Sequence, residues 1–193
     1  MDWSLADEFV EKMYRRSGSV LSQRYYSFGV KRFREYCDEK HIKPSSKNVY
    51  SVLDGFVSSL HAEKLKPKTI ADYISAVRKF LGYVGLDIED SKFRAKVIMP
   101  RVTKIEDEPL TIDNVRILLT KGRPNIKVRA LILLLLSSGM RIGEALSIRV
   151  GDLNLEGNPA TVKIKAEYAK TRVSRLAYVS DEAKEALRPI ITG

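Results

Sequence analysis

Apolar residues recur every three or four positions through the first hundred residues of the chain. Ser4 and Asp7 form an N-capping pattern near the start, and three longer segments then repeat the apolar spacing. The apolar positions are Tyr26, Val30, Phe33 and Cys37, then Val49, Leu53, Phe56 and Leu60, and then Ile70, Ile74, Val77, Leu81 and Val84. Because a spacing near 3.6 residues buries one face of a helix, this pattern predicts a compact all-α domain of four helices.

The pattern breaks at residues 99–110, where two prolines and mixed charges without periodicity indicate a linker. Beyond the break, Thr111 is placed to cap a helix, and a strongly apolar run predicts a buried helix that ends at Gly139. A shorter helix follows. We therefore expect a helical domain at residues 1–98 and a separate domain at residues 111–193.

The second domain contains the only clear period-two alternation in the chain. Val162 and Ile164 alternate with Lys163 and Lys165, and a second alternating run follows a short polar turn, which is typical of a β-hairpin. A capped helix closes the sequence. The predicted fold class is therefore mainly α with a small β-hairpin or sheet: a four-helix domain followed by the first part of a mixed α+β domain.

Composition narrows the function classes. The 193 residues carry a net charge of +10 with a pI near 9.6, which favours a polyanionic partner such as nucleic acid or an acidic membrane surface. A single cysteine, Cys37, excludes an internal disulfide, and two isolated histidines give no zinc-binding spacing. With no long apolar run and an acidic N-terminus, we expect a soluble intracellular protein that needs no metal or cofactor.

Basic side chains cluster on two of the predicted helices. These candidate contacts to a DNA backbone are Arg24, Lys31, Arg32, Lys66, Lys68, Thr69, Arg78 and Lys79. Thr69 can cap the fourth helix, where free N–H groups attract a phosphate, and Arg78 and Lys79 lie off the apolar stripe and are expected to face outward. A solvated helix face remains the simpler interpretation of any one of these lysines.

Arg141 follows a glycine at the start of the short helix, where a guanidinium could bind a phosphate through paired hydrogen bonds. Glu144, one turn later, could pair with a buried basic group and hold the local geometry. Lys170, in the hairpin turn, could bring an ammonium group to the same anion. On spacing alone, an ordinary helix-surface ion pair explains Arg141 and Glu144 equally well.

Four stretches resemble one family, the tyrosine recombinases, which include phage-type integrases and Xer-type enzymes. SGMRIGEALSIRVGDL resembles the first arginine motif, T-G-L-R-I/V-S-E-L followed by L-x-x-x-D-I/L, and AKTRVSRLAYVS resembles the hairpin that carries the family's lysine. EDEPLTIDNVRILL resembles the opening of the catalytic domain, and LKPKTIADYISAVRKFLGYVG resembles the last major helix of the N-terminal DNA-clamping domain. The resemblance covers nearly the whole chain.

This resemblance implies that duplex DNA is the partner and that strand exchange proceeds through a 3′-phosphotyrosyl link. It implies that Arg141 stabilises the phosphate, that Lys170 is the general acid and that Glu144 and Arg175 are supporting residues. Complete family members assemble as tetramers on paired sites. For this chain we expect a monomer in the cytoplasm, associated with a nucleoid and of prokaryotic or viral origin.

The family's later H-x-x-R motif and tyrosine nucleophile have no match after Lys170, and Tyr168 and Tyr178 lie in the wrong motif order. We therefore expect a chain that binds DNA but does not cleave it. It could be a piece of a longer recombinase, which we favour, a natural short product, or one part of an active site that another polypeptide completes. Two rival functions are a non-catalytic DNA-binding or regulatory protein on a recombinase scaffold and an unrelated helical interaction protein.

Overall fold

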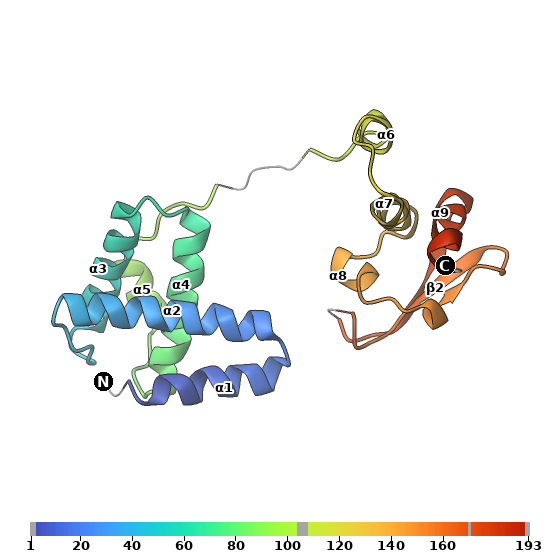
Figure 1. Cartoon of the computed structure of the whole chain (residues 1–193). Helices are drawn as coiled ribbons and strands as arrows, with labels where there is room; N and C mark the ends of the chain where they lie inside the picture. The colour runs from blue at the N-terminus through green and yellow to red at the C-terminus, as the bar shows by residue number, and fades with distance from the viewer. Residues whose placement is uncertain (1–2, 104–107, 170, 192–193) are drawn as a thin grey trace. The chain divides into compact units, whose positions relative to one another are not determined.

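The computed structural model describes residues 3–103, 108–169 and 171–191. The chain divides into two compact units, residues 1–106 and 107–193 (Figure 1). Each unit has its own hydrophobic core. The chain is mainly helical with one small antiparallel sheet, which confirms the predicted fold class. The proposed domain and linker boundaries stay predictions. No helix in the described ranges is long and apolar enough to cross a membrane.

The first unit contains the four predicted helices and one that the pattern missed. The helices are α1 (Leu5–Ser17), α2 (Val20–Glu39), α3 (Val49–Ala62), α4 (Pro67–Tyr83) and α5 (Asp90–Lys96). The predicted apolar stripes of α2, α3 and α4 form the core, in which Phe33, Leu53 and Ile70 are fully buried. The sequence pattern did not predict α5 because this helix is too short to show a period, and Phe93 is its one buried residue.

α2 crosses α4 (Figure 1), and Gly29 of α2 lies at the contact. A Cβ atom built on Gly29 would lie 2.6 Å from the Cβ of Ala76 and 3.5 Å from the carbonyl oxygen of Tyr73. The two helix backbones therefore approach each other closely at a position where any larger side chain would collide.

The second unit follows the predicted order of elements, with one additional strand. The elements are α6 (Ile112–Thr120), α7 (Ile126–Ser138), α8 (Ile142–Ala145), the 3₁₀ helix η1 (Val150–Asp152), β1 (Leu153–Asn154), β2 (Ala160–Ile164), β3 (Arg175–Val179) and α9 (Asp181–Ile191). Thr111 caps α6 by accepting the Asn114 N–H at 3.2 Å, and Gly139 ends α7 in the left-handed region at φ 61°. Both predictions are confirmed.

The sheet has the strand order β1-β2-β3, and both pairs are antiparallel. Val162 pairs with Leu153 on one side and with Ala177 on the other, so the predicted hairpin is the centre and one edge of the sheet. α7 packs against α9, β3 and α8. β1 has two residues, too few for any alternation to show in the sequence.

Several large aliphatic side chains of the second unit stay exposed. The exposed fractions of Ile112, Leu146 and Leu176 are 73%, 69% and 68%. α7 carries an unbroken apolar run from Ala130 to Leu136, yet only Ala130 and Leu134 are buried. The second unit therefore covers its apolar residues less completely than the first.

Candidate active site

The corner between α7 and α8 presents Arg141 to solvent. The left-handed Gly139 turns the chain, Met140 is buried, and Arg141 takes the N-cap position of α8 with an extended backbone. The Arg141 backbone N–H donates to Oε2 of Glu144 at 2.8 Å. The Arg141 side chain is 57% exposed, so its guanidinium, which contacts Glu144 through Nη1, is also accessible to a ligand.

Glu144 is a buried carboxylate that binds two guanidinium groups. Its side chain is 2% exposed, and it accepts two hydrogen bonds from Arg175, at 3.1 and 2.6 Å, and one from Nη1 of Arg141 at 3.3 Å. The Arg175 hydrogen bonds, with the Arg141 backbone N–H, lower the pKa of Glu144 to about 2 although burial raises it. Two cations share one buried anion, which leaves net positive charge at this surface.

A second buried carboxylate lies on η1. The side chain of Asp152 is 4% exposed, and its Oδ1 lies 2.7 Å from Nζ of Lys165. Its Oδ2 accepts the Arg149 backbone N–H at 3.0 Å. The Lys165 hydrogen bond lowers the pKa of Asp152. Sequence reasoning missed this pair because the strand alternation placed Lys165 with the outward-facing residues, and Asp152 appeared only as a motif position.

Lys170 lies outside the described residues, so its assignment is still a prediction. Tyr178 is exposed on β3, and Tyr168 lies in the connection between β2 and β3, with its ring 5.7 Å from Nζ of Lys165. Of the predicted site residues that the structure describes, Arg141, Glu144 and Arg175 come together in one cluster through their hydrogen bonds.

Some of the basic candidates of the first unit already have acidic partners within that unit. Arg32 pairs with Glu35 and Glu63, Lys31 lies 3.9 Å from Glu35, and Lys68 pairs with Asp72 at 2.7 Å.

Other candidates of the first unit are open to a ligand. Arg24 and Lys66 are exposed and form no side-chain hydrogen bond or ion pair within the described ranges. Lys79 donates to the hydroxyl of Tyr26 at 2.8 Å and is otherwise exposed. The strongest candidates for contact with an anion are therefore Arg24, Lys66 and Lys79.

Two expectations about α4 need correction. Pro67 is the first residue of α4 and Lys66 is its N-cap, so Thr69 lies inside the first turn and does not cap the helix. Proline is favoured at this first helical position because it has no N–H to satisfy. Arg78 does not project outward: it stacks 4.4 Å over the ring of Phe93.

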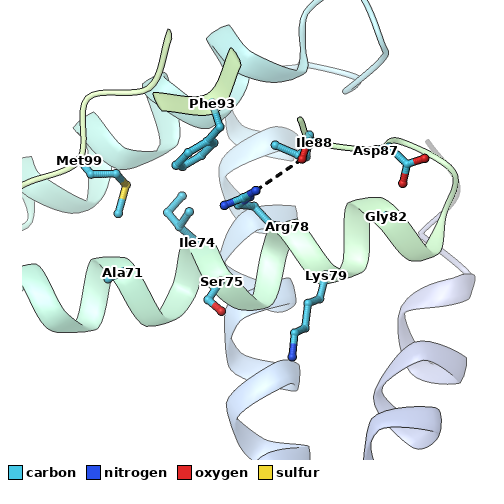
Figure 2. A pocket seen from close by; sticks show the side chains of 10 residues that line it. All are labelled: Ala71, Ile74, Ser75, Arg78, Lys79, Gly82, Asp87, Ile88, Phe93 and Met99. Carbon is cyan, nitrogen blue, oxygen red and sulfur yellow. Dashed lines mark hydrogen bonds between the residues drawn. The ribbon is translucent and has the colours of Figure 1, made fainter. Parts of the chain in front are cut away.

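Figure 2 shows Arg78 directed toward Phe93 and Ile88, whereas Lys79 points away from them. The Arg78 guanidinium donates to the carbonyl of Ile88 and pairs with Asp90. Arg78 thus joins α4 to α5, and its charge is already compensated within the unit.

Both units match known sequence families. Residues 6–84 match the N-terminal SAM-like domain of phage integrases, and residues 108–193 match the phage integrase family. The chain belongs to the tyrosine recombinase family. Among its curated relatives, the tyrosine recombinase XerA of Saccharolobus solfataricus is 29% identical over 178 residues, and XerC of Syntrophus aciditrophicus is 25% identical over 195 residues. These alignments cover 88% and 92% of this chain.

The chain spans 57% of the length of that XerA and 62% of the length of that XerC. Solved structures of recombinases share its fold. XerH bound to a palindromic difH substrate has a TM-score of 0.65 at 20% identity and covers 98% of this chain, which matches 57% of XerH. The Tn1549 transposon integrase in complex with transposon right end DNA has a TM-score of 0.66 at 19% identity, with coverages of 96% and 64%.

Proposed function

We propose that this recombinase chain binds duplex DNA with both of its units and contributes part of the active site for site-specific strand exchange. The observation that carries the proposal is the exposed guanidinium of Arg141, whose Nη1 and backbone N–H both contact the buried Glu144. A preorganised cation that needs no rearrangement is what stabilises the charge that develops on a phosphate during cleavage. In this proposal residues 1–98 clamp DNA, residues 99–110 link the units, and residues 111–193 begin the catalytic domain.

The proposed reaction is a phosphoryl transfer. A deprotonated tyrosine oxygen forms a bond to the scissile phosphorus, and the bond between phosphorus and the 5′ oxygen breaks. Arg141 stabilises the negative charge on the non-bridging oxygens, and Lys170 gives a proton to the departing 5′ oxygen. Glu144 and Arg175 hold Arg141 in place.

The second arginine and the tyrosine nucleophile have no motif match in these 193 residues. We therefore propose that the chain binds DNA but does not cleave it without those groups. It would act as a monomer in solution on the DNA of a prokaryotic or viral genome, in the cytoplasm with the nucleoid, and assemble further only on paired sites.

DNA affinity should fall steeply with salt, because lysine and arginine contacts release counterions from the phosphates. We expect Arg24→Ala to weaken binding and to lower the slope of log Kd against log salt by about one. Arg78→Ala is the matched control, because Arg78 is paired with Asp90 and should leave the slope unchanged. Fluorescence anisotropy of a labelled duplex over a salt series measures both, and an affinity independent of salt would contradict the proposal.

Arg141→Ala should separate binding from cleavage. In a longer version of the protein that holds an H-x-x-R motif and a tyrosine nucleophile, we expect strand cleavage to fall by about 10²–10³-fold, with DNA affinity nearly unchanged. Single-turnover cleavage of a labelled duplex gives the rate, and anisotropy gives the affinity. Cleavage at the original rate would remove Arg141 from the mechanism.

A further inference from the structure

Buried carboxylates hold both ends of the connection between β2 and β3, residues 165–174. At the first end, Nζ of Lys165 lies 2.7 Å from Oδ1 of Asp152. At the second end, the guanidinium of Arg175 makes its two hydrogen bonds to Glu144. Both acids come from the short stretch that begins directly after Arg141. The connection and Arg141 therefore share one anchoring segment.

At the first end of the connection, the carboxylate of Asp152 is fixed in position. Its carboxylate is almost entirely buried, and the Arg149 N–H fixes one of its oxygens from within η1. Lys165 is the cation that compensates the other oxygen. Because an uncompensated buried carboxylate is costly, the structure strongly favours keeping Lys165 in this place.

Hydrogen bonds to the backbone of Lys165 hold the residues that follow it. The carbonyl of Lys165 accepts the N–H groups of Tyr168 at 3.1 Å and Ala169 at 3.2 Å, and Ala169 is buried in the core. The Ala166 N–H donates to Oγ of Ser174 at 3.0 Å and closes the connection on itself. The pair with Asp152 thus fixes the chain as far as Ala169.

We propose that Lys165, held by Asp152, is a positioning residue of the active site. It sets where Ala169 lies, the described residue that directly precedes the proposed general acid in the sequence. The part of this inference that concerns Lys170 rests on the proposed function. Lys165 itself transfers no proton and contacts no DNA in this role.

The first test is amide hydrogen exchange on the whole chain without DNA. In Lys165→Met, we expect the amides of Tyr168 and Ala169 to exchange at least about tenfold faster, because the ion pair that holds their acceptor is lost. The β2–β3 ladder amides should keep their protection, which shows that the unit stays folded. Lys163→Met, an exposed neighbour on β2, is the matched control and should change neither set.

Lys165→Arg distinguishes charge from bulk, since a guanidinium can also bind Asp152. We expect it to restore slow exchange at Tyr168 and Ala169. Unchanged exchange in Lys165→Met, or exchange in Lys165→Arg as fast as in Lys165→Met, would overturn the proposal.

The second test measures whether DNA protects Lys170 from chemical modification. Lysines are acetylated with and without a saturating duplex, and the modified residues are identified by mass spectrometry. In the unaltered chain and in Lys165→Arg, we expect DNA to protect both Lys66 and Lys170. In Lys165→Met, protection of Lys66 should remain and that of Lys170 should be largely lost. Protection of Lys170 that survives in Lys165→Met would overturn this inference alone. Absence of protection at both lysines in the unaltered chain would instead contradict the proposed function.

Discussion

Glu144 is a charged residue buried in the second unit. Its contribution to the stability of that unit depends on its two arginine partners. In the unfolded chain a glutamate titrates near 4.5, whereas the Arg175 and Arg141 hydrogen bonds lower the pKa of Glu144 to about 2 in the folded chain. The unfolded state therefore binds the proton first as pH falls. The stability that this cluster contributes is complete above about pH 4.5 and is lost as pH falls toward 2.

Glu144→Gln should remove that contribution. We expect the second unit to lose roughly 2–4 kcal/mol at neutral pH, because two guanidinium groups lose their shared counter-ion. The difference from the unaltered chain should shrink between pH 4.5 and 2, where Glu144 itself takes up a proton. Chemical denaturation at several pH values measures it, and a constant difference across this range would contradict the account.

Individual residues differ in whether their contacts can be predicted from the sequence. The resemblance to the family's arginine motif singled out Arg141 and Glu144, whose spacing alone fits an ordinary helix-surface pair equally well. The Asp152–Lys165 pair could not be predicted, because it depends on the register that brings the end of β2 to η1. The cap at Thr69 was wrong for a local reason: Pro67 starts α4 earlier.

Among the elements, helices with long apolar stripes were predictable and short elements were not. α2, α3 and α4 each repeat the stripe over several turns, and the hairpin shows its alternation on two strands. α5 and β1 are defined mainly by what they pack against, α3 for the helix and β2 for the strand. Their residues carry too few repeats for any period to appear.

The crossing of α2 and α4 gives a prediction at this scale. Gly29→Ala should destabilise the first unit by about 1–3 kcal/mol, because the new methyl group meets Ala76 at 2.6 Å and the helices must separate. Gly82→Ala is the matched control in α4, since its nearest neighbour would be Asp87 at 3.7 Å. That change should be neutral or stabilising.

Thermal or urea unfolding of both variants tests the crossing. Adding Ala76→Gly to Gly29→Ala should recover part of the loss, because it removes the methyl group that collides. Equal stability of the two single variants would show that the crossing tolerates an added methyl group.

For the molecule as a whole, the two units should unfold separately. The buried clusters of residues 1–106 and 107–193 have no member in common, and the second unit leaves more aliphatic surface exposed. We expect two calorimetric transitions, with the second unit melting first. Residues 1–106 alone should reproduce the upper transition, and one transition for the whole chain would contradict this view.

Separate cores also matter for how such a gene can change over generations. A crossover between two related genes within the codons for residues 99–110 would split neither core, since every buried cluster lies wholly on one side. Under the proposed function, offspring of such an exchange would inherit the proposed DNA clamp from one parent and the residues around Arg141 from the other. In that proposal, each unit can change without disturbing the packing of the other.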